Sequence, residues 1–349
     1  MVDFSQYKNY ALMRLPHADS FRFIAQESGP LRELKSISEL SGKSGFLFSP
    51  YNIDDAHPLL LLRADVDAMY NVADLPLGVS RGVGVADAMT DDYRNNFDSY
   101  VDELVQGNVA KLVLSRTLDI ELGEVDAVEL FARACRRYPR VVIYLFVAEG
   151  WGAWLGCTPE LLISSDGNVC RTVALAGTQP VPTELSGEET FKMELWDEKN
   201  LHEQNIVEKY IDSVLSGYTD DCRKDGPFTV RAGDLLHIKT SFEFSMKGDA
   251  SLAALVDALH PTPAVCGLPN ETARRIIAKH ESRQRSYYSG FVGLWQMDGC
   301  TELYVNLRCM HGEAGRVRLY AGGGILPTSV MEQEWRETQE KMKTILNIL

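Results

Sequence analysis

The C-terminal stretch of the chain combines bare glycine amides with closely spaced charged side chains. Gly322 and Gly323 belong to a glycine run, and Glu334, Glu337 and Lys341 follow at spacings of i, i+3 and i+7. Residues at these spacings share one face of a helix. Two carboxylates and an ammonium beside free amides are suited to binding a metal ion and an anion. Taken alone, the same pattern more commonly marks a solvated helix edge with an i,i+4 ion pair.

A further candidate carboxylate is Glu203. It lies in line with Val207, Tyr210 and Val214 at helical spacing. A buried glutamate must be paired, hydrogen-bonded or bound to a metal. Oxygen ligands from Glu203 and the C-terminal helix would suit Mg²⁺, which takes one or two carboxylates together with water and substrate oxygens. Taken alone, a glutamate in this pattern more commonly lies at the edge of the apolar stripe, where its side chain reaches water.

Two strand ends carry groups that are suited to moving protons. Lys111 opens KLVLSR, and Glu160 begins the strand in TPELLI. A lysine acts as a base only when desolvation or a nearby cation lowers its pKa toward neutrality. A glutamic acid at a sheet edge could serve as a proton donor. A solvated side chain is the commoner alternative at each position.

Other positions are candidates for contact with a ligand. Gly177, followed by Thr178 at a strand end, permits close approach of a ligand to the backbone, although a tight turn is as good an explanation. His260 and Ala264 lie in the rigid loop HPTPA, where the histidine could equally cap a helix. Arg308 is predicted inside an apolar strand and implies a carboxylate partner, more commonly one from the protein than one from a ligand.

The elements that must position these residues follow from periodicity and turn signals. Helices are predicted over 93–106, 125–137, 187–215, 252–259 and 271–282, with a last helix starting from a Ser329–Glu332 capping box. Strands are predicted over 111–120, 141–148, 151–156, 160–164, 171–175, 237–246, 291–296, 303–310 and 317–321. In the 303–310 strand, Tyr304, Asn306 and Arg308 would alternate onto one face.

Hairpins outnumber parallel crossovers in this pattern, which predicts an α+β fold of antiparallel sheets with helices outside. No linker rich in Pro, Gly or Ser divides the chain, so a single domain over 1–349 is expected. Within it, residues 1–95 are the part least readable by periodicity.

Composition narrows the class of partner. The formal net charge of −14 argues against nucleic acid and against an anionic membrane surface. An anionic small ligand would need locally clustered cations. The seven cysteines are scattered singly, which indicates neither a zinc module nor a disulfide framework and favours a reducing cytoplasm. The N-terminus does not have the pattern of a signal peptide, and the apolar runs are too short to span a bilayer.

Nine motifs in order give the chain a resemblance to the chorismate-utilising enzymes, a family that includes isochorismate, salicylate and anthranilate synthases. They are KLVLSR, TPELLISSDG, ALAGT, DEKNLHEQ, LHPTPAVCGLP, YYSGFVG, LRC, YAGGGI and EWRET. The resemblance runs from about Lys111 to Leu349. It implies two antiparallel sheets packed as a sandwich with helices outside. It leaves residues 1–95 as a variable N-terminal part.

The resemblance implies roles for the candidate residues. Lys111 matches a general base acting on water, and Glu160 matches the acid that protonates the departing ring hydroxyl. Glu203 and Glu337 match carboxylates that bind Mg²⁺, with Glu334 close by.

The remaining matches concern the substrate, chorismate. The side chains of Tyr288, Arg308 and Lys341, with the amides of Gly322 and Gly323, match positions that hold the enolpyruvyl carboxylate. The pair Gly177 and Thr178 matches contacts near the ring, and the loop with His260 and Ala264 is expected beside the substrate.

Three features of the sequence predict which member of the family this protein is. Ala176 stands where aminodeoxychorismate synthases carry a nucleophilic lysine, so water or ammonia must attack directly. The loop HPTPAVCG resembles that of isochorismate synthases, and the LLES motif of tryptophan-sensitive anthranilate synthases is missing. The expected protein is therefore a Mg²⁺-dependent isomerase, an isochorismate synthase, acting as a cytoplasmic monomer without a glutaminase partner, in menaquinone or siderophore biosynthesis. Salicylate synthase, anthranilate synthase component I with an ammonia source, and a non-catalytic chorismate sensor remain as alternatives.

Overall fold

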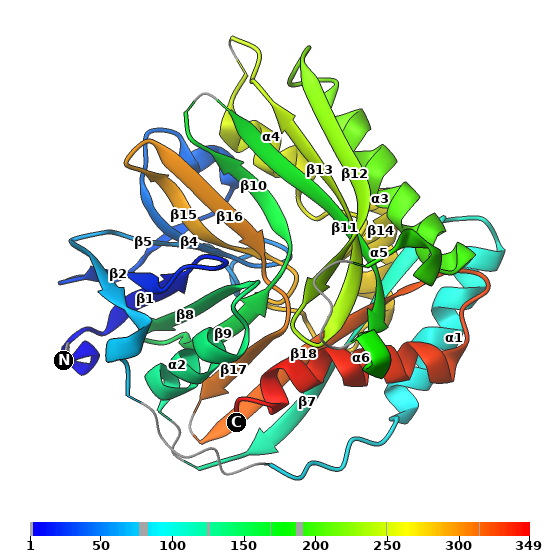
Figure 1. Cartoon of the computed structure of the whole chain (residues 1–349), viewed down its shortest axis with the longest axis horizontal. Coiled ribbons are helices and arrows are strands. Elements are labelled where there is room, and N and C mark those ends of the chain that lie inside the picture. Colours follow the sequence, from blue (N-terminus) through cyan, green and yellow to red (C-terminus); the bar gives the residue numbers. More distant parts are fainter. Residues whose placement is uncertain are drawn as a thin grey trace.

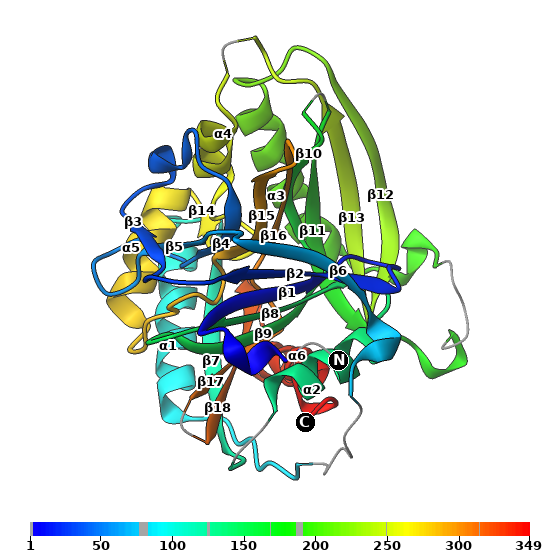
Figure 2. The ribbon, with the colours of Figure 1, turned by 90° about the vertical axis from the view of Figure 1, so that its left-hand side faces the viewer.

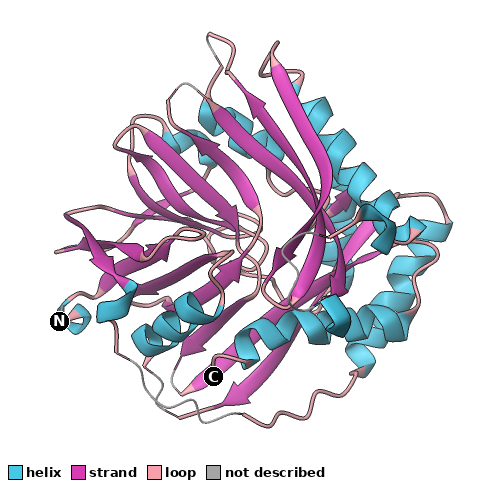
Figure 3. Ribbon diagram, in the orientation of Figure 1, coloured by secondary structure: helices cyan, strands magenta, loops and turns pink. Residues whose placement is uncertain are grey.

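The chain folds into two large antiparallel sheets with helices on the outside (Figures 1 and 3). The computed structural model describes residues 3–76, 83–123, 126–167, 169–185, 191–248, 250–313 and 315–349. Neighbouring strands pair antiparallel throughout the described ladders. The predicted α+β class and antiparallel sheets are confirmed.

Within the described residues, each sheet has nine strands. The order of the first is β14 (Gly267–Leu268), β7 (Lys111–Glu121), β18 (Arg316–Ile325), β17 (Cys309–Glu313), β9 (Gly152–Thr158), β8 (Val142–Ala148), β1 (Asn9–Arg14), β2 (Ser20–Gln26) and β6 (Val66–Asn71). The order of the second is β12 (Cys222–Ala232), β13 (Leu235–Phe244), β11 (Cys170–Pro180), β10 (Leu161–Ser165), β16 (Cys300–Val305), β15 (Phe291–Met297), β4 (Gly45–Ser49), β5 (Leu59–Leu62) and β3 (Arg32–Leu34). Strands from the first 71 residues therefore extend both sheets. This sharing supports a single domain, which stays a prediction.

Aromatic side chains fill the space between the two sheets. Phe48 of β4 stacks on Phe146 of β8 with ring centroids 4.7 Å apart, and it also stacks on Tyr287 at 4.5 Å. These rings belong to one buried cluster that includes residues of both sheets. Burial of this much apolar surface, at roughly 25 cal/mol per Å², is what holds the sheets face to face.

Helices cover the outer faces (Figure 2). The first sheet packs against α2 (Ala127–Arg137) and the end of α6 (Met331–Leu346), and the second against α3 (Glu198–Leu215) and α4 (Leu252–Leu259). Around β7 lie α1 (Asp91–Val105) and α5 (Asn270–His280). No helix in the described ranges is long and apolar enough to cross a membrane.

Two helices begin later in the chain than predicted. The helix predicted from residue 187 begins at Glu198, where the Asp197 side chain caps it by accepting a hydrogen bond from the Asn200 amide. The predicted capping box at Ser329 is absent. The α6 helix starts at Met331, and the Ser329 hydroxyl accepts a hydrogen bond from the Leu326 amide at 3.0 Å instead. Residue 125, the predicted start of another helix, and residue 187 lie outside the described residues.

The predicted strand over 303–310 is also wrong. It is divided between β16, in the second sheet, and β17, in the first, so the chain crosses between the sheets at residues 306–308. Arg308 has a φ of 47°, a left-handed conformation that breaks strand alternation. Arg308 therefore does not share a strand face with Tyr304 and Asn306. The exposed strand β12 was not predicted because its polar sequence does not alternate.

Candidate active site

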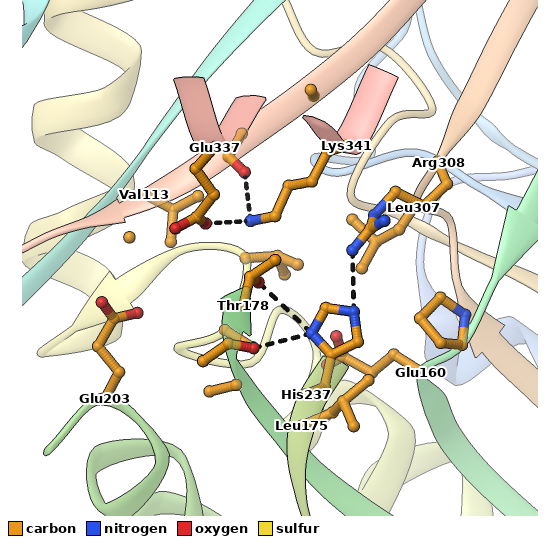
Figure 4. Close-up of a pocket in the computed structure, with 18 of the residues that line it drawn as sticks. Val113, Glu160, Leu175, Thr178, Glu203, His237, Leu307, Arg308, Glu337 and Lys341 are labelled. Carbon is orange, nitrogen blue, oxygen red and sulfur yellow. Dashed lines mark hydrogen bonds and ion pairs between the residues drawn. The ribbon is translucent and has the colours of Figure 1, made fainter. Parts of the chain in front are cut away.

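A cavity lies where β7 and β18 of the first sheet meet β11 and β13 of the second, closed by α3 and α6 (Figure 4). Most of the predicted site residues line it. They are Lys111, Glu160, Gly177, Thr178, Glu203, Ala264, Tyr288, Arg308, Gly322, Glu337 and Lys341. These residues come from β7, β11, β18, α3 and α6 and from several loops, and they converge on one space.

Lys111 is fully buried at the start of β7. Only 1% of its surface is exposed, and its Nζ lies 3.2 Å from Oε2 of Glu203 on α3. This contact depends on Gly324, which pairs opposite Val113 in the ladder between β18 and β7. A Cβ at position 324 would lie 2.5 Å from Glu203 Oε2 and 2.8 Å from Lys111 Cε. The glycine therefore leaves the room in which the lysine and the carboxylate meet.

Replacing Gly324 with alanine should separate Lys111 from Glu203 and reduce turnover by about 100-fold, because small misplacements of reacting groups carry penalties of this order. Gly312 is the control, since a Cβ there has its nearest neighbour at 3.8 Å. Steady-state kinetics of Gly324→Ala and Gly312→Ala test the prediction. Equal activity of the two variants would contradict it.

Glu160 is the buried acid of the cavity, with 2% of its surface exposed. Burial raises its pKa to about 7, against the lowering effects of a hydrogen bond from Thr262 and of the charges on Lys111, Lys341 and Arg308. The Thr262 hydroxyl donates to Glu160 Oε1 at 3.4 Å. A carboxyl group with this pKa is protonated often enough near neutral pH to donate a proton.

Lysines neutralise the acidic side of the cavity. Lys199 Nζ lies 2.5 Å from Glu334 Oε1 and 3.6 Å from Glu203 Oε1. On α6, Lys341 donates to Glu337 Oε1 at 2.6 Å and to the Gly322 carbonyl at 2.9 Å. Burial would raise the pKa of Glu337, but Lys341 and other cations lower it below the ordinary value. Burial and the neighbouring Glu337 raise the pKa of Glu334.

The acidic residues fit the hard oxygen donors that Mg²⁺ requires. Among the described residues, Oε2 of the buried Glu334 has no hydrogen-bond partner, and a Cβ on Gly323 would lie 3.6 Å from it and 3.8 Å from Glu337 Oε1. Across the described ranges, no three His, Cys, Asp or Glu side chains are grouped closely enough to enclose a metal ion by themselves. That arrangement suits a metal held by one or two carboxylates and completed by water and substrate oxygens.

A buried histidine that the sequence did not single out orients Arg308. His237 on β13 has its Nδ1 2.8 Å from the Gly177 carbonyl and its Nε2 3.0 Å from Arg308 Nη2. Burial and the Arg308 charge lower the pKa of His237 to about 3, so the ring is neutral. The carbonyl requires a proton on Nδ1, which leaves Nε2 to accept a hydrogen bond from the arginine. The histidine therefore aims a guanidinium group into the cavity beside Thr178.

Three predicted site residues do not line the cavity. Glu334 on α6 and Gly323 on β18 lie beside each other and outside the cavity lining. His260 is buried elsewhere: its Nε2 lies 3.3 Å from the Tyr51 carbonyl, and its ring packs edge-on against Phe291. The loop that contains it reaches the site through Thr262, Ala264 and Val265 instead.

A family model described as chorismate binding enzyme matches residues 80–349. The chain belongs to this family. This chorismate-binding enzyme is 35% identical over 246 residues to isochorismate synthase EntC of Escherichia coli (strain K12), covering 69% of the chain and 62% of the relative. It is 30% identical over 264 residues to the vibriobactin-specific isochorismate synthase of Vibrio cholerae, covering 73% and 66%. The chain thus spans less than two thirds of the length of these relatives.

Solved structures share the fold. The menaquinone-specific isochorismate synthase MenF from Escherichia coli superposes with a TM-score of 0.79 at 23% identity, covering 98% of this chain and 89% of that one. The predicted arrangement of two antiparallel sheets with outer helices, characteristic of chorismate-utilising enzymes, is therefore confirmed.

Proposed function

We propose that this chorismate-binding enzyme is an isochorismate synthase, which moves the ring hydroxyl of chorismate by adding one water and releasing another. The observation that carries the proposal is a buried lysine and a buried carboxylic acid facing one cavity, Lys111 and Glu160. A base and an acid together are what such an exchange requires. Ala176 lines the same cavity and offers no nucleophile for a covalent route.

The exchange of water for the ring hydroxyl balances in atoms and protons with Lys111 as the base and Glu160 as the acid. As the general base, Lys111 accepts a proton from a water molecule as the water oxygen bonds to the ring. The ring double bonds shift, and the C–O bond to the departing hydroxyl breaks. Glu160 donates its proton to that hydroxyl, which leaves as water. The product has the formula of the substrate, and proton return from Lys111 to Glu160 through solvent completes the cycle.

Arg308 and Lys341 supply the positive charge that a substrate with two carboxylates needs in an acidic protein. Arg308 is buried, and burial lowers its pKa to about 10, so it remains charged at neutral pH. We assign Arg308, Tyr288, Lys341 and the glycine amides of β18 to the enolpyruvyl carboxylate. Gly177, Thr178 and Ala264 would contact the rest of the substrate.

Glu203 and Glu337 would hold Mg²⁺, with Glu334 reaching it directly or through water. When bound, the ion would offset the charge of the ring carboxylate. Glu203→Gln and Glu337→Gln should each abolish the heat of Mg²⁺ binding in calorimetry, because each removes an anionic oxygen ligand. Glu340→Gln is the control, since Glu340 sits on the same helix and pairs with the exposed Lys343. Unchanged Mg²⁺ affinity in both site variants would refute this assignment.

Product analysis tests the proposed reaction. Chorismate is incubated with the enzyme, with and without Mg²⁺, and the products are separated by chromatography. Metal-dependent isochorismate without pyruvate supports the proposal. Salicylate with equimolar pyruvate would make the protein a salicylate synthase, and anthranilate formed with added ammonium would make it an anthranilate synthase. Binding without turnover would indicate a sensor.

We further propose a monomer without a glutaminase partner, acting in menaquinone or siderophore biosynthesis, the two routes to which its relatives' names point. A cytoplasmic location rests on the seven cysteines, all of which are free thiols.

A further inference from the structure

Arg285 is a buried arginine that connects separate walls of the cavity without entering it. Only 5% of its surface is exposed. Its Nη2 donates to the Val113 carbonyl on β7 at 2.6 Å, and its Nη1 donates to the Val265 carbonyl at 2.6 Å. Its own backbone carbonyl accepts a hydrogen bond from the Tyr288 amide at 3.0 Å. Val113, Val265 and Tyr288 all line the cavity.

Glu281, which follows α5, fixes the position of the guanidinium group. Arg285 Nη2 and Nε donate to its two carboxylate oxygens at 2.6 and 2.8 Å. The same carboxylate accepts hydrogen bonds from the Ser115 amide at 2.9 Å and the Ser115 hydroxyl at 2.8 Å. The guanidinium carbon also lies 4.6 Å from the centre of the Tyr51 ring. Both members of the ion pair therefore bind β7, Arg285 through Val113 and Glu281 through Ser115.

The geometry of this pair matters more than its charge. A buried ion pair contributes little net stability, because desolvation offsets the attraction. A planar guanidinium fork can meet two carbonyls and a carboxylate at once, which a lysine ammonium on a flexible stem cannot do in the same geometry. Here the fork holds the strand that begins with Lys111 at a fixed separation from the loop containing Ala264 and Val265.

We propose that Arg285, held by Glu281, is a positioning residue for the reaction, which keeps the Lys111–Val113 stretch, the Ala264–Val265 loop and Tyr288 in register around the substrate. This inference rests on the proposed function. Neither member touches the cavity, so Arg285 acts through the backbone of the residues it binds.

Kinetics of Arg285→Lys, compared with Arg14→Lys, test the proposal. Arg14 is the matched control: it is 1% exposed and donates to the carbonyls of Tyr138 and Pro139, away from the cavity. Both variants should lose thermal stability. Measured well below both melting temperatures, Arg285→Lys should lose about 100-fold in kcat/KM, as misplaced reacting groups do, while Arg14→Lys stays near wild type. Equal kcat/KM values would overturn the proposal.

Ser115→Ala decides the matter if Arg285→Lys does not fold. This variant removes one hydrogen bond to Glu281, and its kcat/KM, measured well below its melting temperature, should fall by about fivefold. Wild-type kcat/KM in this variant would overturn the proposal. A wild-type protein inactive on chorismate would instead remove the proposed function. Calorimetry would then show weaker chorismate binding by Arg285→Lys than by Arg14→Lys if Arg285 positions the cavity, and equal binding if it does not.

Discussion

Replacing Lys111 with alanine should lower kcat by about 10³-fold while chorismate still binds, because a general base contributes rate enhancements of this order. Lys111 Nζ is the buried amine that faces the cavity from β7, and alanine leaves no group in its place to accept the proton from water. Binding should persist because we assign the substrate carboxylate to Arg308 and Lys341, which this substitution leaves in place. Steady-state kinetics and calorimetric titration with chorismate measure the two effects separately.

Lys343→Ala is the control, since Lys343 is an exposed lysine on α6 that pairs with Glu340. It should behave as wild type. Substantial turnover by Lys111→Ala would show that another group is the base. Loss of chorismate binding together with turnover would assign Lys111 to substrate binding instead.

Replacing Glu160 with glutamine should also lower kcat by about 10³-fold, because the amide cannot donate the proton that the departing hydroxyl needs. The amide has the shape of the acid, so the folded structure and chorismate binding should be retained. Glu302→Gln is the control: burial raises the pKa of Glu302 too, but its partner is Tyr304 and it lies outside the cavity. Rapid turnover by Glu160→Gln would exclude Glu160 as the acid.

The raised pKa of Glu160 has a consequence for stability that does not depend on activity. Its folded-state pKa of about 7 exceeds the ordinary value of 4.5. Between these pH values the folded protein keeps a proton that the unfolded chain has released, so this group destabilises the fold as pH rises. The contribution amounts to about 3 kcal/mol and levels off above pH 7. The difference in unfolding free energy between wild type and Glu160→Gln should change by this amount over the interval. A pH-independent difference would contradict the raised pKa.

Local periodicity predicted the parts of the site that lie on regular elements. Glu334, Glu337 and Lys341 are on one helix, as their spacing requires, and Glu203 is on another. The hairpin signals likewise predicted antiparallel sheets, because a hairpin is formed by residues that are close together in the sequence.

What local patterns missed depends on contacts between distant segments. Alternation along the sequence predicts Arg308 inside a strand, whereas the chain changes sheets there and Arg308 adopts a left-handed backbone without being glycine. His237 binds groups 60 and 71 positions away, and only the assembled sheets bring them together. An uncommon residue such as histidine inside an alternating apolar strand was the available signal. His260, by contrast, was expected beside the substrate from its motif, and the structure buries it against Phe291.

In the proposed reaction a water molecule, activated at Lys111, replaces the ring hydroxyl. Turnover of chorismate in ¹⁸O-labelled water, followed by mass spectrometry of the product, shows whether it does. We expect isochorismate that carries one oxygen from the solvent, formed only with Mg²⁺. Isochorismate without the label would contradict water addition, and labelled solvent yielding only salicylate and pyruvate would contradict the proposed product.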